Sequence, residues 1–281
     1  SLSLKEYYEM LEIANTIQPL NSSGNVDFIN GKIILASSGF SNTNHDFAQF
    51  QSDVQSDPNI NPYLLLVNAA VNGSPVEDWT DLSSFKWSYV NDTVLPANGV
   101  TLEQIQIVWF KHTHVRAQLL PAPNNTWPGH AITINEDYET IARNLKTFYP
   151  NLKLIYISTR ARAYTTDIGA NSASSVSSEL YTFEEGFAAK WMILDQINGD
   201  PSLSYNGTNS STAWMSWGPY LWVDGINQRS DGYVWNCDDT ISDGVHLTQG
   251  VPGKGTYKTS SMLMNFFKTD PTTISWFLKN T

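Results

Sequence analysis

Short apolar runs alternate along the chain with longer amphipathic stretches. Four of the runs have the length of a strand that is buried on both faces: residues 33–36, 63–69, 105–110 and 152–157. Unbroken apolar runs of this length, bounded by turn-forming residues, are typical of parallel strands that helices cover on both faces. The pattern therefore predicts an α/β fold.

Apolar residues recur at helical spacing around these runs. The predicted helices cover residues 4–17, 46–54, 135–148, 181–197, 253–267 and 274–278. Two stretches lack a clear period: residues 78–100 predict a helix fragment followed by a loop, and residues 165–178 predict a mobile loop. We expect a single domain over residues 1–281, because strands and helices still alternate beyond that loop.

The alternating units predict a three-layer α/β/α sandwich with a doubly wound, mainly five-stranded parallel sheet of the flavodoxin-like kind. We expect the strand order 2-1-3-4-5, whose switch point falls between strands one and three. Ligands bind at such a point, outside the carboxyl ends of the strands. Ser41 and His114 follow these two strands, so the topology predicts that they flank the site.

Ser41 lies in the polar stretch Ser-Ser-Gly-Phe-Ser-Asn-Thr that follows the first apolar run. The stretch predicts a tight turn into a helix that begins near Asn44, with Asn42 or Thr43 as its cap. A hydroxyl at the carboxyl end of a strand, beside the free N–H donors of a helix, is well placed for acyl chemistry. The alternative interpretation is a polar loop that only caps the helix.

Asp243 and His246 stand three residues apart near the other end of the chain. This spacing is one turn of helical or turn geometry, so the carboxylate can hold the imidazole and stabilise its charged form. Serine needs such a base because its hydroxyl is a weak nucleophile at neutral pH. We expect Ser41, His246 and Asp243 to act together, with Ser38 as the competing nucleophile and Asp239 as the competing carboxylate.

These segments together resemble the SGNH (GDSL-like) hydrolases, in which a serine after the first strand works with a late Asp-x-x-His pair. The sequence Gly-Phe-Ser-Asn at 39–42 is similar to the Gly-x-Ser-Asn variant of the carbohydrate acetylesterase branch. The segment 72–79 resembles the second block of the family, whose glycine, here Gly73, serves the oxyanion hole. The third block departs from the family, because the best alignment puts His114 where the family has asparagine.

The resemblance implies a serine ester hydrolase that needs neither cofactor nor metal. His246 would deprotonate Ser41, the serine would attack an ester carbonyl, and water would later release the acyl group. The N–H groups of Ser41 and Gly73, with the ring of His114, would bind the oxyanion. The expected substrate is a small-molecule or carbohydrate ester with a short, acetyl-like acyl group. The residues that we expect to contact this substrate are Asn42, Trp109, Arg160, Tyr220 and Trp222.

Tryptophan and tyrosine are dense between residues 205 and 233. Such aromatic residues usually belong to the hydrophobic core. The functional alternative is a platform on which sugar rings stack beside the catalytic groups.

Two other classes of protein compete with the esterase. A metal site could use His112 and His114 on one strand face with His246 or Asp243, but alternate residues of a strand always share a face, and no tight ligand cluster accompanies them. A noncatalytic carbohydrate-binding protein could keep the same fold. Labelling of Ser41 by an organophosphonate would separate these classes from a serine hydrolase.

Composition and charge disfavour some classes of binding partner. The net charge is -11, which disfavours nucleic acid and anionic membranes because both would repel such a surface. Cys237 is the only cysteine, so an intrachain disulfide is excluded. No apolar run approaches membrane-spanning length. The chain begins at Ser1 without Met, which leads us to expect a secreted or extracytoplasmic protein whose signal peptide has been removed. Its oligomeric state stays open.

Overall fold

A central sheet organises the computed structural model, which describes residues 4–165 and 179–279. Five parallel strands pair in the order β2-β1-β3-β4-β5. The strands are β1 (Ile33–Gly39), β2 (Leu64–Val67), β3 (Ile105–Lys111), β4 (Leu154–Ile157) and β5 (Trp214–Trp217). The predicted strand order is therefore confirmed. Most of the predicted loop 165–178 lies outside the described residues.

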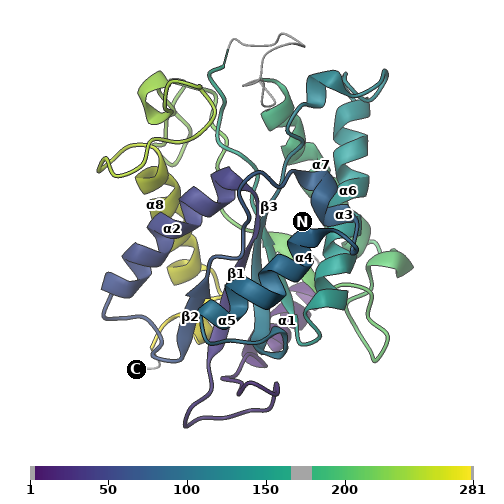
Figure 1. Cartoon of the computed structure of the whole chain (residues 1–281), viewed down its shortest axis with the longest axis vertical. Helices are drawn as coiled ribbons and strands as arrows, with labels where there is room; N and C mark the ends of the chain where they lie inside the picture. Colours follow the sequence, from purple (N-terminus) through teal and green to yellow (C-terminus); the bar gives the residue numbers. More distant parts are fainter. Residues whose placement is uncertain (1–3, 166–178, 280–281) are drawn as a thin grey trace.

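Helices cover both faces of this sheet, which confirms the predicted three layers. They are α1 (Leu4–Asn15), α2 (Ser41–Ser56), α3 (Val76–Thr80), α4 (Phe85–Tyr89), α5 (Leu95–Ala97), α6 (Gly129–Phe148), α7 (Tyr181–Ile197), α8 (Thr256–Thr269) and α9 (Ile274–Phe277). Figure 1 shows α2 and α8 together on one side of the strands and α3, α6 and α7 together on the other. The chain thus winds on both faces, as a doubly wound sheet requires.

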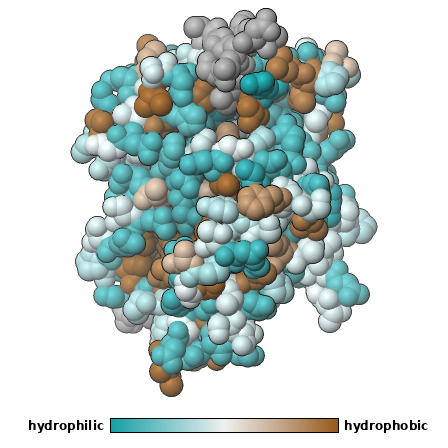
Figure 2. All heavy atoms as spheres, viewed as in Figure 1, coloured by the Kyte–Doolittle hydropathy of each residue, from teal (hydrophilic) through white to brown (hydrophobic). Residues whose placement is uncertain are grey.

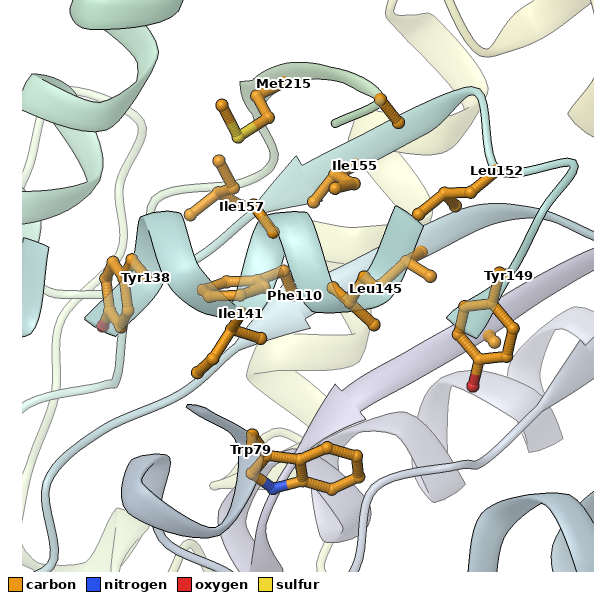
Figure 3. Close-up of a cluster of buried hydrophobic side chains, with 14 of the residues drawn as sticks. Trp79, Phe110, Tyr138, Ile141, Leu145, Tyr149, Leu152, Ile155, Ile157 and Met215 are labelled. Atoms are coloured by element: carbon orange, nitrogen blue, oxygen red, sulfur yellow. The ribbon is translucent and has the colours of Figure 1, made fainter. Parts of the chain in front are cut away.

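The alternation of side chains along each strand builds two separate cores. On β3, Ile107 and Trp109 face the layer of α1, α2, α8 and α9, whereas Val108 and Phe110 face the layer of α6 and α7. Figure 3 shows the second core, where Phe110 and Ile157 from the strands lie against Tyr138 and Ile141 of α6. Because all of β3 is buried, it holds the centre of the sheet in place.

Several predicted elements differ from the structure, among them α6, which begins at Gly129 and not at the predicted residue 135. Helix α2 begins at Ser41, earlier than the predicted start near Asn44, and neither Asn42 nor Thr43 is its cap. Residues 78–100 are mostly helical, because α3, α4, the π-helix Val90–Val94 and α5 follow one another there. The aromatic stretch 205–233 contains β5, which the hydrophobic pattern did not locate.

The surface mixes residue types. Figure 2 shows hydrophobic residues scattered among hydrophilic ones over the face drawn in Figure 1. Within the described residues, no helix has the length and the apolar character that crossing a membrane would require.

Candidate active site

Ser41 lies at the first residue of α2, directly beyond the carboxyl end of β1. The turn between them depends on Gly39: a Cβ there would lie 2.2 Å from the backbone oxygen of Lys111 and 2.3 Å from Oγ1 of Thr43. Only glycine permits so close an approach between β1, β3 and α2. The chain therefore turns from strand to helix within two residues, which places the Ser41 hydroxyl beside the N–H groups that begin the helix.

His246 reaches Ser41 from a loop 205 residues further along the chain. Its Nε2 lies 2.8 Å from Oγ of Ser41, and its Nδ1 lies 2.6 Å from Oδ2 of Asp243. The exposed fractions of the His246 and Asp243 side chains are 23% and 27%, and Ser41 is half-buried, so all three lie at the protein surface. The structure thus brings together the three residues predicted as a triad, in the order that proton transfer needs.

Asp243 also shapes the loop that carries His246. Its Oδ1 accepts hydrogen bonds from the backbone N–H groups of Val245 and His246, at 2.8 and 2.9 Å. Burial alone would raise the pKa of Asp243, but the hydrogen bonds from the His246 ring and from the two N–H groups outweigh it and lower this pKa. The carboxylate therefore stays charged at neutral pH, where it can stabilise a protonated imidazole.

Gly244 fixes the position of this loop against the rest of the molecule. Its φ is +68°, and a Cβ there would lie 2.6 Å from backbone atoms of Tyr164 and Thr165. Its carbonyl accepts a hydrogen bond from the N–H of Tyr164 at 2.6 Å. Because a side chain would clash with this backbone, glycine is needed between Asp243 and His246.

Asp239 anchors the same loop but does not hold the imidazole. Its carboxylate accepts hydrogen bonds from Nζ of Lys258 at 2.7 Å and from the N–H groups of Asn236 and Gly255 at 2.7 and 3.0 Å. Thr240 and Leu247 then pair as an antiparallel bridge around the turn. Asp239, the competing carboxylate, therefore stabilises the loop and does not contact the imidazole.

Ser38 forms a second serine–histidine pair, which the sequence analysis did not predict. Its Oγ lies 2.8 Å from Nε2 of His112, and the ring of His112 packs edge-on against Trp79 at 5.6 Å. Both members of this pair are buried. Burial lowers the pKa of His112 from 6.5 to about 3, so its ring is neutral at neutral pH.

His114 follows β3 as predicted, and its ring points toward the α6 layer. Its Nε2 lies 2.8 Å from Oδ2 of Asp137, and its ring packs against that of His130 at 5.4 Å. His130 in turn has its Nδ1 2.9 Å from Oε2 of Glu184. An oxyanion role for His114 stays a prediction, and Asp137 is the residue that would orient its ring.

The segment after β2 carries Gly73, the second predicted oxyanion donor. Hydrogen bonds tie this segment to β1 and α2: Val71 N–H donates to the carbonyl of Gly39 at 3.0 Å, and Nδ2 of Asn44 donates to the carbonyl of Ala70 at 2.8 Å. Gly73 itself is exposed and has a φ of +69°. Its N–H as an oxyanion donor also stays a prediction.

The five residues predicted to contact substrate occupy different environments. Trp109 is fully buried, stacks on Phe47 and donates its indole N–H to Oγ of Ser158 at 2.9 Å, so its ring belongs to the core. Arg160 is buried as well, and its backbone N–H donates to Oε2 of Glu185 at 3.3 Å. Burial raises the pKa of Glu185 to about 7, and the guanidinium of Arg160 opposes that shift.

The other three lie nearer to solvent or to the nucleophile. Tyr220 lines a surface cavity, and Trp222 packs on Phe183 with ring centroids 4.6 Å apart. Asn42 follows Ser41 directly, and both polar atoms of its buried amide lack a hydrogen-bond partner within the described parts of the chain. A buried amide without partners costs free energy, and a substrate contact for Asn42 stays a prediction.

His45 is a site residue that the sequence analysis missed. It lies one helical turn after Ser41 on α2, and its ring is 5.5 Å from that of His246, with an angle of 48° between the two planes. Burial, followed by the nearby His246, lowers the pKa of His45. The four-residue spacing from Ser41 could have indicated it, had the helix been predicted to begin at the serine.

Metal binding finds no support in this geometry. Across residues 4–165 and 179–279, no group of three or more His, Cys, Asp or Glu side chains is arranged to hold a metal ion. His112 and His114 both lie beyond the end of β3, and their rings have different partners: His112 contacts Ser38, and His114 contacts Asp137. The Ser41–His246–Asp243 arrangement instead supplies a nucleophile, its base and a carboxylate that orients the base.

Comparison with known proteins was made at the level of sequence and of structure. No protein-family model and no curated protein matches the chain. One solved structure, described as that of a proposed platelet activating factor from Streptococcus pneumonia, is similar to it with 12% sequence identity and a TM-score of 0.46. The likeness covers 94% of this chain and 93% of the other.

Proposed function

We propose that this protein is a serine ester hydrolase of the SGNH kind that removes short, acetyl-like acyl groups. The observation that carries the proposal is the continuous contact from Ser41 through His246 to Asp243, at 2.8 and 2.6 Å, at the carboxyl edge of the sheet. A half-buried hydroxyl at the start of a helix, with a base and a charged orienting group behind it, suits attack on an ester carbonyl.

In the proposed reaction, Nε2 of His246 takes the proton of the Ser41 hydroxyl as its oxygen attacks the carbonyl carbon. Asp243 stabilises the imidazolium that results, and His246 then gives its proton to the departing alkoxide. A water molecule, deprotonated by His246, attacks the acyl-enzyme; the bond from the acyl carbon to Ser41 Oγ breaks, and the serine regains its proton.

The negative charge that develops on the carbonyl oxygen needs hydrogen-bond donors to stabilise it. We propose the N–H groups of Ser41 and Gly73 and the ring of His114 for this role. Asn42 is the proposed contact to the substrate beside the nucleophile, because its buried amide offers both a donor and an acceptor. A carbohydrate ester is the proposed natural substrate, on the strength of the Gly-Phe-Ser-Asn sequence at 39–42.

Covalent labelling tests the proposal directly. We expect a p-nitrophenyl alkylphosphonate to attach to Ser41 with release of p-nitrophenol, and peptide mapping by mass spectrometry to find the adduct on that residue. The Ser41→Ala variant should not be labelled, whereas Ser38→Ala should be labelled like the wild type because the Ser38 hydroxyl is buried. Absence of any adduct on the folded wild type would overturn the proposal and would favour a noncatalytic binding protein on this fold.

A further inference from the structure

An aromatic cavity lies at the same edge of the sheet as Ser41 but at the far strand. Its volume is about 330 Å³. The residues that line it are Phe183, Gly186, Phe187, Lys190, Trp217, Gly218 and Tyr220. Four of these seven side chains are aromatic, and the two glycines leave space between them. A cavity of this volume has room for one or two aryl rings, since a cavity of about 150 Å³ already admits benzene.

The register of the sheet places this cavity relative to the nucleophile strand. Ser38 pairs with Phe110, Phe110 pairs with Ile157, and Ile157 pairs with Trp217. Ser38 and Trp217 therefore stand in one row, three strand spacings apart, which is about 14 Å. The cavity thus lies at the carboxyl end of β5, too far from the end of β1 to hold a short acyl group bound to Ser41.

The walls of the cavity are held in place from behind. The guanidinium of Arg229 lies over the ring of Tyr220, 5.9 Å from its centroid, and Nη1 of Arg229 donates to the carbonyls of Tyr220 and Trp222 at 2.6 and 2.9 Å. The ring of Trp217 meets Tyr220 edge-on at 5.8 Å. Rigid aromatic walls of this kind bind a ligand without first losing much conformational freedom.

A glycine inside a helix makes room for one of these walls. Gly186 lies in the interior of α7, where glycine weakens a helix relative to alanine. A Cβ at this position would lie 3.0 Å from the hydroxyl oxygen of Tyr220 and 3.3 Å from its ring. The helix therefore keeps a destabilising residue at the point where a side chain would push Tyr220 out of its position.

The chemistry of the lining selects the ligand. A sugar ring carries several hydroxyl groups that need hydrogen-bond partners, whereas the lining side chains offer few polar groups: the Lys190 ammonium, the Tyr220 hydroxyl and the Trp217 indole N–H. Aromatic walls favour a flat apolar ring, through burial and through edge-on contacts. Lys190 is exposed at the cavity and supplies a positive charge for an anionic substituent.

We propose that this cavity binds an aryl group, with an anionic substituent at Lys190, as the remote end of the ester substrate. The inference rests on the proposed ester hydrolase for the role of the ligand, but the binding of the aryl group itself does not depend on catalysis. A substrate would then carry its ester at Ser41, beyond the end of β1, and its aryl group at the end of β5; these two strands are three strand spacings apart, which is about 14 Å.

Binding of 2-naphthoate to the full chain tests the inference, measured by isothermal titration calorimetry. We expect saturable binding of one molecule per chain, unchanged in Ser41→Ala. Phe183→Ala and Tyr220→Ala should each weaken it about tenfold, which corresponds to about 1.4 kcal/mol of lost contact. Phe85→Ala is the matched control, because Phe85 is an exposed phenylalanine on another helix, and it should leave binding unchanged.

A second experiment replaces Lys190, which is exposed, so that its result does not depend on whether Phe183→Ala and Tyr220→Ala fold. Lys190→Gln should weaken 2-naphthoate severalfold and leave the neutral 2-naphthamide unchanged. Absence of saturable binding to the wild type at millimolar probe would overturn the inference, as would equal affinity in Phe183→Ala, Tyr220→Ala and the wild type. Because Ser41→Ala is included, failure of the proposed ester hydrolysis and failure of this binding site give different results.

Discussion

Two serine–histidine pairs of equal length lie on either side of one tight turn. Ser41 with His246 and Ser38 with His112 both show a distance of 2.8 Å. The first pair is open to solvent and has Asp243 behind its imidazole, whereas the second is buried. Nδ1 of His112 has no hydrogen-bond partner among the residues that the structure describes. The two pairs therefore differ not in their serine–histidine contact but in their access to solvent and in the third residue behind the imidazole.

Replacing Ser41 and Ser38 one at a time by alanine should give the largest difference in activity between the two pairs. We expect Ser41→Ala to reduce kcat for short aryl esters by roughly 10⁵-fold or more, because the nucleophile is lost. Ser38→Ala should retain most of the activity, because its buried hydroxyl contacts only groups inside the fold. Initial rates with p-nitrophenyl acetate measure both, and thermal unfolding confirms that both variants fold. Loss of activity in Ser38→Ala alone would show that the nucleophile has been misassigned.

The carboxylate is the second difference between the pairs. Asp243→Asn should lower kcat by about 10⁴-fold, because the amide keeps a contact to Nδ1 but supplies no charge to stabilise the imidazolium. Asp239→Asn is the matched control, since Asp239 bonds Lys258 and not the imidazole. It should lower the free energy of unfolding and change kcat far less. A near wild-type rate in Asp243→Asn would assign the orientation of His246 to another group.

Substitutions of His114, which follows β3, test whether a side chain takes part in binding the oxyanion. If its ring donates to the oxyanion, His114→Ala should lower kcat about 100-fold and change KM little, because the bond strengthens as charge develops. His114→Asn should recover part of the rate, since an amide can donate from a similar place. Asp137→Asn should weaken the orientation of the ring and give a smaller loss. Unchanged kcat in His114→Ala would leave the oxyanion to backbone N–H groups.

The pair Ser41–His246 also differs from the pair Ser38–His112 in having His45 packed beside its imidazole. Its ring lies 5.5 Å from that of His246, and burial lowers its pKa, so it is neutral at pH 7 and contacts His246 as a ring and not as a charge. His45→Ala should lower kcat by about tenfold, because the His246 ring loses a neighbour that holds its orientation. His45→Phe should restore most of the rate. A phenylalanine variant as slow as alanine would mean that the nitrogens of His45 are needed.

Much of the fold could be predicted because its determinants are local. Four buried runs and the helices between them predicted the α/β fold and its strand order, whereas Ser41 was paired with Asp243 and His246 through the resemblance of these segments to the SGNH hydrolases. Strand β5 escaped prediction because Trp214, Met215, Ser216 and Trp217 form a short strand within an aromatic-rich stretch, without a distinct apolar run.

The rest of the site depends on contacts between distant parts of the chain. The start of α2 at Ser41 follows from the approach of Gly39 to the carbonyl of Lys111, which no local pattern reveals. The error in the helix start also hid His45, whose place one turn after the serine becomes clear only once the helix begins there. Pairing between Ser38 and His112 depends on the register of β1 with β3.

The pH dependence of stability should report the burial of the second pair, with the smallest effect on activity. Burial lowers the pKa of His112 from 6.5 to about 3, so the folded protein disfavours its protonated form. The stability that comes from keeping this ring neutral is full above pH 6.5 and is lost as the pH falls from 6.5 toward 3, at up to ~1.4 kcal/mol per pH unit.

In His112→Asn this loss is absent, while the carboxylates elsewhere titrate as before. The variant should be less stable than the wild type at pH 7, because the contact to Ser38 changes, and the difference should shrink as the pH falls to 4. Urea unfolding at several pH values measures it, and a difference that stays constant would show that His112 is not held neutral by burial.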